Sequence, residues 1–296
     1  IFFVPYTASG FAACGKLFAN LFGLDYVPAM IISAIVIVAY TTLGGFLAAS
    51  TTDFVQSIVM TLAIIVVFGF GIMKVGSFEA VMANAQSMAG YFSLTQIHDA
   101  AIGTASPYGI LTIFSMLAWG LGYCGMPHIL IRFMAIRSEK ELKKSSAIAI
   151  VWVVLSLGFT IAIGLLGRAF LYPEILGVTE GAPSAESVFI EMIQKVFIEK
   201  IPIPFIAGLF ICGILAAVMS TADSQLLVCS SSVSKDIYQN ILNPEASDKK
   251  VLNVARLTTF GVAVVAFFIA WDPNSSIMDL VSDAWAGLGA AFGPIV

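Results

Sequence analysis

Long runs of apolar residues, separated by short polar stretches, dominate the pattern along this chain. A helix needs roughly 20 consecutive apolar residues to cross a bilayer core of about 30 Å. The runs lack the apolar–polar alternation of strands in a membrane barrel, so helices are expected. The pattern predicts eight membrane-spanning helices, in whole or in part, at residues 1–22, 27–49, 53–73, 110–131, 146–171, 203–228, 251–270 and 277–296.

Composition points to an integral membrane protein surrounded by a lipid bilayer. Of the 296 residues, 59% are hydrophobic and 11% are charged, whereas soluble domains carry about 25% charged residues. The net charge of -4 gives no reason to expect a nucleic-acid partner. Both ends of the chain lie inside apolar runs. We therefore expect residues 1–296 to be a single transmembrane domain, truncated at both ends.

Lysine and arginine residues set the expected orientation, because cytoplasmic loops carry them in excess. They concentrate at residues 132–144 and 235–256, two loops that are separated by two predicted helices and therefore face the same side. The glutamate-rich loop between them, residues 172–201, is expected outside. Alternation then places Lys16 and residues 77–107 outside, and residues 50–52 in an inner loop.

The stretch AAVMSTADSQLLVCSSS, residues 216–232, places polar groups in the middle of an apolar helix. On a helical wheel, Ala217, Ser220, Thr221 and Ser224 fall within one arc of about 100°. Hydroxyl oxygens and backbone carbonyls together can ligate a hard cation such as Na⁺. The same hydroxyls can instead bond carbonyls of their own helix, so the residues alone leave both interpretations open.

Two carboxylates are candidates for ion handling. Asp223 lies beside the hydroxyl arc, and a carboxylate inside a membrane helix indicates function. It could support the ion site or line an aqueous vestibule. Asp53 begins a predicted helix and, with Gln56, resembles an N-cap with a capping-box partner. Asp53 also shares a helix face with Ser57 and Thr61, which would make a polar path from the cytoplasmic end.

The segment LAWGLGYCGMPHILIRFMA, residues 117–135, is expected to contain a broken helix. Three glycines loosen its turns, and Pro127 removes a backbone donor. A break inside the membrane can free backbone groups toward a cavity. Trp119, Tyr123 and Pro127 recur every four residues and so share a face, where the aromatic rings could enclose a small ligand. The segment could instead be an ordinary kinked helix with interfacial aromatics.

Four stretches resemble the sodium/solute symporter family, and most closely its sodium/proline symporters. They are WGLGYCGMPHILIRFMA at 119–135, LAAVMSTADSQLLVCSSSVSKDIY at 215–238, GGFLAASTTDFVQ at 44–56 and SDAWAGLGAAFGPIV at 282–296. The resemblance implies an all-α, leucine-transporter-type bundle of two inverted five-helix repeats. About eight of those helices would lie in this chain, and the broken first core helix, which supplies the remaining sodium ligands, would lie outside it.

The resemblance also implies site residues. Ala217 would provide a carbonyl ligand for sodium, and Ser220 and Thr221 would provide hydroxyl ligands. Asp53 matches an aspartate that takes part in ion handling in the family. Trp119, Tyr123 and Pro127 match the substrate-side helix. Tyr6 matches an aromatic residue near the substrate pocket.

The implied function is sodium-coupled symport of a small solute, with L-proline as the expected substrate and a bacterial inner membrane as the expected location. Asp223 and Asp283 depart from the expected proline-transporter pattern, so the chain could also be a symporter of this family for another organic solute. Two alternatives of other classes are the symporter-like membrane module of a sensor kinase and a passive channel or ion-independent carrier. No residue pattern resembles a catalytic triad, a phosphate loop or a redox site, so an enzyme is not expected.

Overall fold

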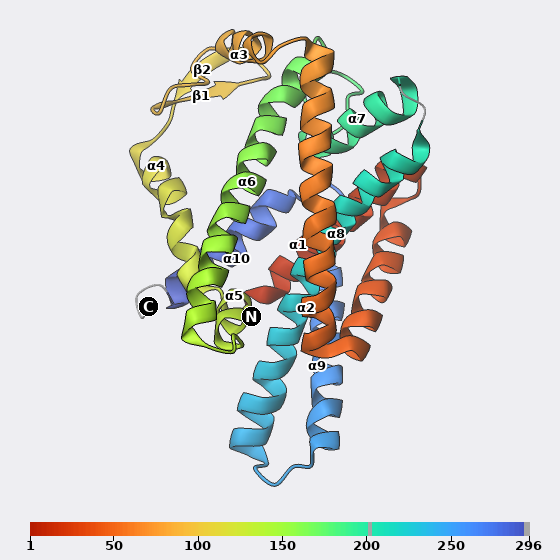
Figure 1. Ribbon diagram of the computed structural model, residues 1–296, viewed down its shortest axis with the longest axis vertical. Coiled ribbons are helices and arrows are strands. Elements are labelled where there is room, and N and C mark those ends of the chain that lie inside the picture. The colour runs from red at the N-terminus through yellow and green to blue at the C-terminus, as the bar shows by residue number, and fades with distance from the viewer. Residues whose placement is uncertain (201–202, 293–296) are drawn as a thin grey trace. The chain divides into compact units, whose positions relative to one another are not determined.

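The computed structural model describes residues 1–200 and 203–292, and these residues are mostly helical (Figure 1). The longer elements are α1 (Phe3–Phe22), α2 (Tyr26–Val75), α6 (Glu139–Leu171), α8 (Pro204–Ser231), α9 (Asp248–Ile269) and α10 (Ile277–Phe292). The shorter helices are α3 (Phe78–Gln86), α4 (Ile110–Leu117), η1 (Ala118–Gly125), α5 (Pro127–Met134), η2 (Ala185–Ser187), α7 (Val188–Gln194), η3 (Lys195–Lys200) and η4 (Ser232–Leu242).

Each of the eight predicted segments forms a helix or a run of helices. Among the described residues, six ranges are long and apolar enough to cross a membrane: Tyr26–Leu47, Ala49–Val75, Ile110–Met134, Glu139–Leu171, Pro204–Leu242 and Asp248–Ile269. The helices α1 and α10 are the two predicted segments outside this set. The predicted end of the last segment, residues 293–296, lies outside the described residues.

A bend at Gly45 divides α2, and it corrects the predicted inner loop at residues 50–52. Gly45 has φ 63° and ψ -168° inside an otherwise helical run, and glycine adopts a positive φ without the steric penalty of a side chain. Figure 1 shows the sharp turn near the start of the long orange helix. Residues 50–52 are helical, and the Thr51 hydroxyl bonds the Leu47 carbonyl of the same helix at 2.8 Å.

Two helices extend further than the apolar pattern predicts. The helix α6 begins at Glu139, capped by Ser138, whose hydroxyl accepts from the Glu141 amide at 3.4 Å. The helix α8 extends beyond the C-terminal end of its predicted span, because it continues without interruption into the π-helical η4. Lys235 therefore lies on a helix instead of in the predicted loop. Apolar runs mark the part of a helix that contacts lipid, and they do not mark polar turns that continue beyond it.

A short hairpin lies in a segment that was predicted to be a loop. The strands β1 (Gln96–Asp99) and β2 (Thr104–Pro107) pair antiparallel, with Gln96 opposite Pro107 and Asp99 opposite Thr104. They lie in the segment between α3 and α4, which was expected to be an outer loop. Strands of four residues carry too little alternation to be recognised from sequence.

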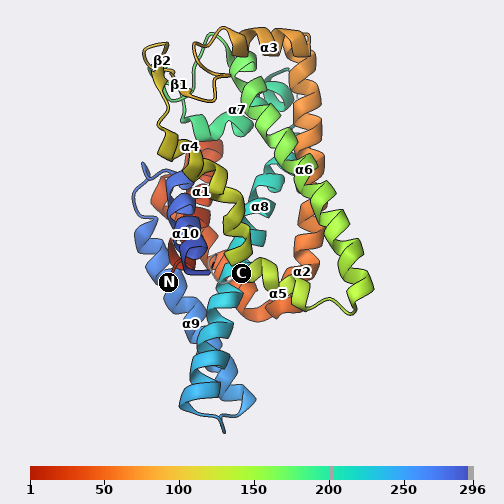
Figure 2. The ribbon, with the colours of Figure 1, turned by 90° about the vertical axis from the view of Figure 1, so that its left-hand side faces the viewer.

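The chain forms two compact units, each assembled from separate stretches of sequence. The first contains residues Ile1–Ser57, Trp119–Ala135 and Leu215–Val296, and the second contains Ile58–Ala118 and Ile136–Ile214. In the first unit α1 packs against α9 and α10 (Figure 2). Its cores include Phe11, Met30 and Leu226, which are all at 0% exposure. In the second unit Val67, Leu166 and Met192 form a separate core. The single-domain organisation stays a prediction.

Within each unit, segments predicted to lie on the same side of the membrane are close together. In the first unit Lys16, predicted outside, donates to the Ser275 carbonyl at 2.7 Å, and residue 275 follows the predicted outer end of a span. In the second unit Lys74 lies 3.7 Å from the centre of the Phe170 ring. A hollow of about 340 Å³ there is lined by both His98 and Arg168. The alternation of predicted inner and outer ends is therefore consistent within each unit.

Candidate functional site

The predicted sodium ligands surround one backbone carbonyl on α8. The Ser220 hydroxyl donates to the Ala217 carbonyl oxygen at 3.2 Å, and the Thr221 hydroxyl donates to the same oxygen at 3.0 Å. The three residues are half-buried and offer only oxygen atoms, which suits a hard cation such as Na⁺. The same bonds would satisfy the helix backbone alone, so the sodium-binding role of Ala217, Ser220 and Thr221 stays a prediction.

Asp223 lies beside these residues and is fully buried, at 0% exposure. Its Oδ2 accepts a hydrogen bond from Tyr40 Oη on α2 at 2.7 Å, and its Oδ1 lies 3.1 Å from the Ser224 hydroxyl. A buried carboxylate requires such partners, because removing an unpaired charge from water is costly. Asp223 therefore faces side chains of α2 and α8 and not an open vestibule. Its role in ion handling stays a prediction.

Asp53 pairs with Arg132, a residue that sequence reasoning placed in a cytoplasmic loop. The N-cap interpretation of Asp53 is wrong, because α2 continues through this position and bends earlier, at Gly45. Asp53 Oδ2 forms an ion pair with Arg132 Nη2, and the same nitrogen donates to Ser224 Oγ at 2.6 Å. Arg132 lies in the last turn of α5, so its assignment to a loop is also corrected.

The predicted break in the segment 117–135 is confirmed. The helix α4 ends at Leu117, a 3₁₀ helix spans Ala118–Gly125, and α5 begins at Pro127. Met126, the residue before the proline, is extended, with φ -96° and ψ 97°. Proline disfavours a helical conformation in the residue before it and is well suited to the first turn of a helix. The sequence therefore determines both the end of one helix and the start of the next.

Trp119 and Tyr123 gather around Trp285, which comes from α10 and was not predicted as a site residue. The rings of Trp119 and Trp285 stack with centroids 5.2 Å apart, and Tyr123 meets Trp285 edge-on at 4.5 Å. Gly122 makes this approach possible, because a Cβ atom there would lie 2.8 Å from Trp285 Cε3. The only sequence signal for Trp285 was its place in the stretch SDAWAGLGAAFGPIV.

Tyr6 and Pro127 lie next to this aromatic cluster. Tyr6 packs against the apolar cluster that contains Trp285, and its ring meets that of His128 at 6.3 Å in an edge-on arrangement. His128 directly follows Pro127 at the start of α5. The structure thus brings Tyr6, Trp119, Tyr123 and Pro127 into one region of the first unit, and their role in substrate binding stays a prediction.

Several buried polar atoms in the first unit have no hydrogen-bond partner among the described residues. They include Trp285 Nε1, Gln225 Nε2 and His128 Nδ1. Gln225 is at 0% exposure, and its Oε1 accepts from the Thr7 hydroxyl at 3.1 Å. Leaving a buried donor unpaired costs about 1–3 kcal/mol. Such groups are therefore candidates to contact a polar solute.

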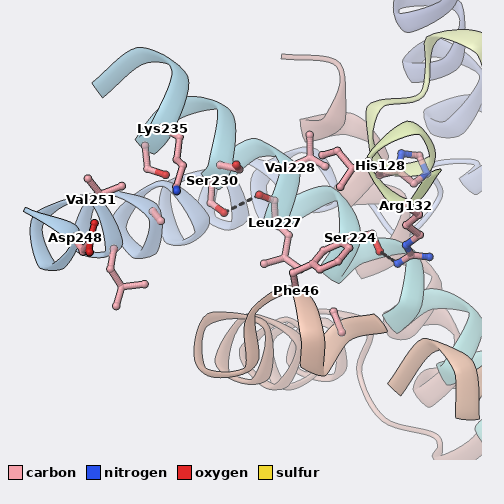
Figure 3. Close-up of a pocket in the computed structure, with 16 residues that line it drawn as sticks. Phe46, His128, Arg132, Ser224, Leu227, Val228, Ser230, Lys235, Asp248 and Val251 are labelled. Carbon is pink, nitrogen blue, oxygen red and sulfur yellow. Dashed lines mark hydrogen bonds between the residues drawn. The ribbon is translucent and has the colours of Figure 1, made fainter. Parts of the chain in front are cut away.

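A cavity of about 610 Å³ adjoins α8 in the first unit (Figure 3). Ser224 and Arg132 line it at one end, and Lys235 and Asp248 line it further along. Ala49 also lines it, beside the bend of α2. These lining residues lie at or near the predicted inner ends of their helices.

Comparison with known proteins provides a family match. The model of the sodium:solute symporter family matches residues 1–296. A sodium/proline symporter 2 of Staphylococcus saprophyticus is 40% identical over 299 residues, covering 100% of this chain and 55% of that protein. The high-affinity proline transporter PutP of Bacillus subtilis is 41% identical, covering 100% of this chain and 59% of that protein. The osmoregulated proline transporter OpuE of the same species is 38% identical, covering 100% of this chain and 56% of that protein. The chain thus spans just over half the length of these relatives.

A solved structure supports the fold. A Na⁺-coupled sialic acid symporter, in a substrate-bound outward-open state, matches with a TM-score of 0.75 at 21% identity, covering 100% of this chain and 62% of that one. Likeness at this identity establishes the fold alone. It confirms the expected all-α, leucine-transporter-type membrane architecture.

Proposed function

Because this chain belongs to the sodium:solute symporter family, we propose that the protein performs sodium-coupled symport of a small solute, and that the solute is L-proline. The support for proline is that three relatives, at 38% to 41% identity over the whole of this chain, are proline transporters. The support for sodium is the family itself together with the oxygen ligands on α8.

The proposed mechanism is secondary active transport by alternating access. Sodium moving down its gradient would drive uptake, with ion and solute bound near the middle of the bilayer. Coupling requires that bound sodium raise the affinity for the solute, and linkage then requires that the solute raise the affinity for sodium by the same factor. The protein is a multi-pass membrane protein, and we propose a bacterial inner membrane with residues 132–144 and 249–250 facing the cytoplasm.

One observation carries the proposed ion site: two adjacent hydroxyls converge on the Ala217 carbonyl in the middle of an apolar span. A hydroxyl that donates its proton to this carbonyl keeps lone pairs for a cation. Ser220 and Thr221 therefore could bind Na⁺ without a change of rotamer. Ligands from outside this chain would complete the coordination, because three oxygens are fewer than a hard cation usually binds.

The aromatic cluster is the proposed solute site. Trp119, Tyr123 and Trp285 offer ring faces and edges to an apolar ring such as that of proline. Tyr6 and Pro127 border the same region. The cluster and the ion site both belong to the first unit.

Sodium titration of proline uptake tests the ion site in the full-length protein. Ser220→Ala or Thr221→Ala removes one hydroxyl from a desolvated cation, and a hydrogen bond or ligand contact to a charged group is worth about 1.5–3 kcal/mol. The sodium concentration for half-maximal uptake should therefore rise about ten- to a hundredfold. High sodium should restore the apparent proline affinity at least partly.

Thr259→Ala is a matched control. The Thr259 hydroxyl is also buried and bonds its own helix, at 3.1 Å from the Ala255 carbonyl of α9. Its removal should leave the sodium curve unchanged. If Ser220→Ala and Thr221→Ala likewise lower only the amount of protein, with no shift of the sodium curve, the hydroxyls serve the helix backbone and the proposed ion site is incorrect.

A further inference from the structure

Arg132 connects three elements of the first unit. It lies in the last turn of α5, where its Nη2 pairs with Asp53 Oδ2 on α2 and donates to Ser224 Oγ on α8 at 2.6 Å. Figure 3 shows Arg132 and Ser224 directed toward each other at the end of the cavity. The Arg132 side chain is 42% exposed and the Asp53 side chain 11%. Water can therefore reach the guanidinium, and its bonds can break and re-form during a transport cycle.

From Ser224 the contacts lead to the proposed sodium ligands. Ser224 is 5% exposed, and its hydroxyl lies 2.9 Å from the Ser220 carbonyl oxygen, one turn back along α8. The hydroxyl of Ser220 in turn bonds the Ala217 carbonyl. By donating to Ser224 Oγ, Arg132 leaves that hydroxyl with its own proton to give to the Ser220 carbonyl or to Asp223 Oδ1. Arg132 thus orients a group that directly contacts the backbone of the ion site.

On its own helix, α5, Arg132 is connected to the proposed solute site. The helix α5 is short, Pro127–Met134, and an extended residue separates it from η1, which carries Trp119 and Tyr123. At its first turn the His128 ring meets those of Phe3 and Tyr6, with centroids 5.4 Å and 6.3 Å apart. Since a single short helix carries both His128 and Arg132, a shift of α5 on solute binding would move the guanidinium relative to α8.

We propose that Arg132 is a positioning residue that couples sodium binding on α8 to solute binding at the broken helix. The proposal rests on the proposed function. Its central element is the charge-assisted bond from Arg132 to Ser224, because this bond joins the helix of the solute site to the helix of the ion site. The pair with Asp53 holds the guanidinium in place against α2.

The test is the factor by which sodium raises proline affinity in the purified full-length protein. Proline binding is measured without sodium and at saturating sodium, and sodium binding is measured without proline. Ser224→Ala removes the bond to α8 and leaves the Arg132–Asp53 pair. A lost bond to a charged group corresponds to roughly a tenfold effect or more. The coupling factor should therefore fall about tenfold, and proline affinity measured without sodium should stay near the wild-type value.

Ser230→Ala is the matched control. Ser230 lies on the same helix and lines the same cavity, but its hydroxyl bonds its own helix, 2.9 Å from the Leu227 carbonyl. Its coupling factor should equal that of the wild type. Arg132→Gln should lower the factor as Ser224→Ala does, and the double variant should be no worse than Arg132→Gln alone, because both changes remove the same bond between Arg132 and Ser224. Arg132→Lys, which keeps the charge, should recover part of the factor.

The outcomes separate this proposal from the one on which it rests. A wild-type coupling factor near one would refute sodium-coupled transport and the link together. If the wild-type coupling factor is large and Ser224→Ala leaves it unchanged, the proposed role of Arg132 is refuted and sodium-coupled transport is not. The same conclusion follows if the double variant lowers the coupling factor by the product of the two single effects, because the two residues would then act independently. If Arg132→Gln does not reach the membrane, Ser224→Ala and Arg132→Lys still decide the question.

Discussion

Replacing Gly122 with alanine tests whether the position of Trp285 matters for solute binding. The new Cβ would lie 2.8 Å from Trp285 Cε3 and 3.3 Å from Cζ3, and real Cβ contacts are essentially never shorter than about 3.0 Å. Trp285 is 7% exposed and is held by Trp119 and Tyr123. The rigid indole must therefore move as a whole, or the 3₁₀ helix must move away from α10.

Overpacking of this kind costs about 1–3 kcal/mol. If the solute binds only when Trp285 keeps its place, this energy opposes binding. At about 1.4 kcal/mol per factor of ten, proline affinity should fall roughly five- to 150-fold. The assay is proline binding to the purified full-length protein at saturating sodium, with thermal unfolding of the same sample to measure stability.

Gly120→Ala is the control, since it adds the same methyl group to the same 3₁₀ helix, where nothing described lies within 4 Å of the new Cβ. It should bind proline as the wild type does. If Gly122→Ala binds proline as well as Gly120→Ala while losing stability, the stacked ring is only packing. The assignment of the aromatic cluster to the solute would then be wrong.

Three further predictions follow from individual contacts. Trp285→Phe replaces the indole with a smaller aromatic ring and removes an N–H that has no hydrogen-bond partner among the described residues, so in a competition assay it should weaken binding of proline more than binding of pyrrolidine, which lacks the carboxylate. Tyr40→Phe removes a 2.7 Å bond to a fully buried carboxylate, that of Asp223, and should lower stability by about 1–3 kcal/mol, measured by thermal unfolding. In intact cells, Gly181→Cys should react with a membrane-impermeant thiol reagent and Lys143→Cys should not, and labelling at position 143 would reverse the proposed orientation.

Local features of this protein could be predicted from sequence because their causes are local. Apolar runs long enough to span a bilayer form helices whatever surrounds them, since backbone groups in lipid must bond within the segment. The break before Pro127 follows from the missing N–H and the restricted residue before it. Likewise the Ala217, Ser220 and Thr221 oxygens share a face because a helix of 3.6 residues per turn brings positions three and four apart together.

Where the sequence around a position allowed two local structures, the tertiary structure decided which one forms. The turn between the second and third predicted spans could be made by the polar residues 50–52 or by a glycine, and Gly45 makes it. Asp53 is consequently inside a helix, where it pairs with a cation in place of capping an N-terminus. A residue pattern contains both possibilities, and the packing of α2 against its neighbours selects one.

The partners of the site residues could come only from the folded structure. Arg132 reaches Asp53 and Ser224, and Trp285 closes the cluster around Trp119, although long stretches of sequence separate the members of each group. Nothing in the order of residues specifies such pairs. They form because α5, α10, the part of α2 up to Ser57 and the part of α8 from Leu215 belong to one compact unit, which brings distant positions within contact distance and removes the water that would otherwise satisfy their polar groups.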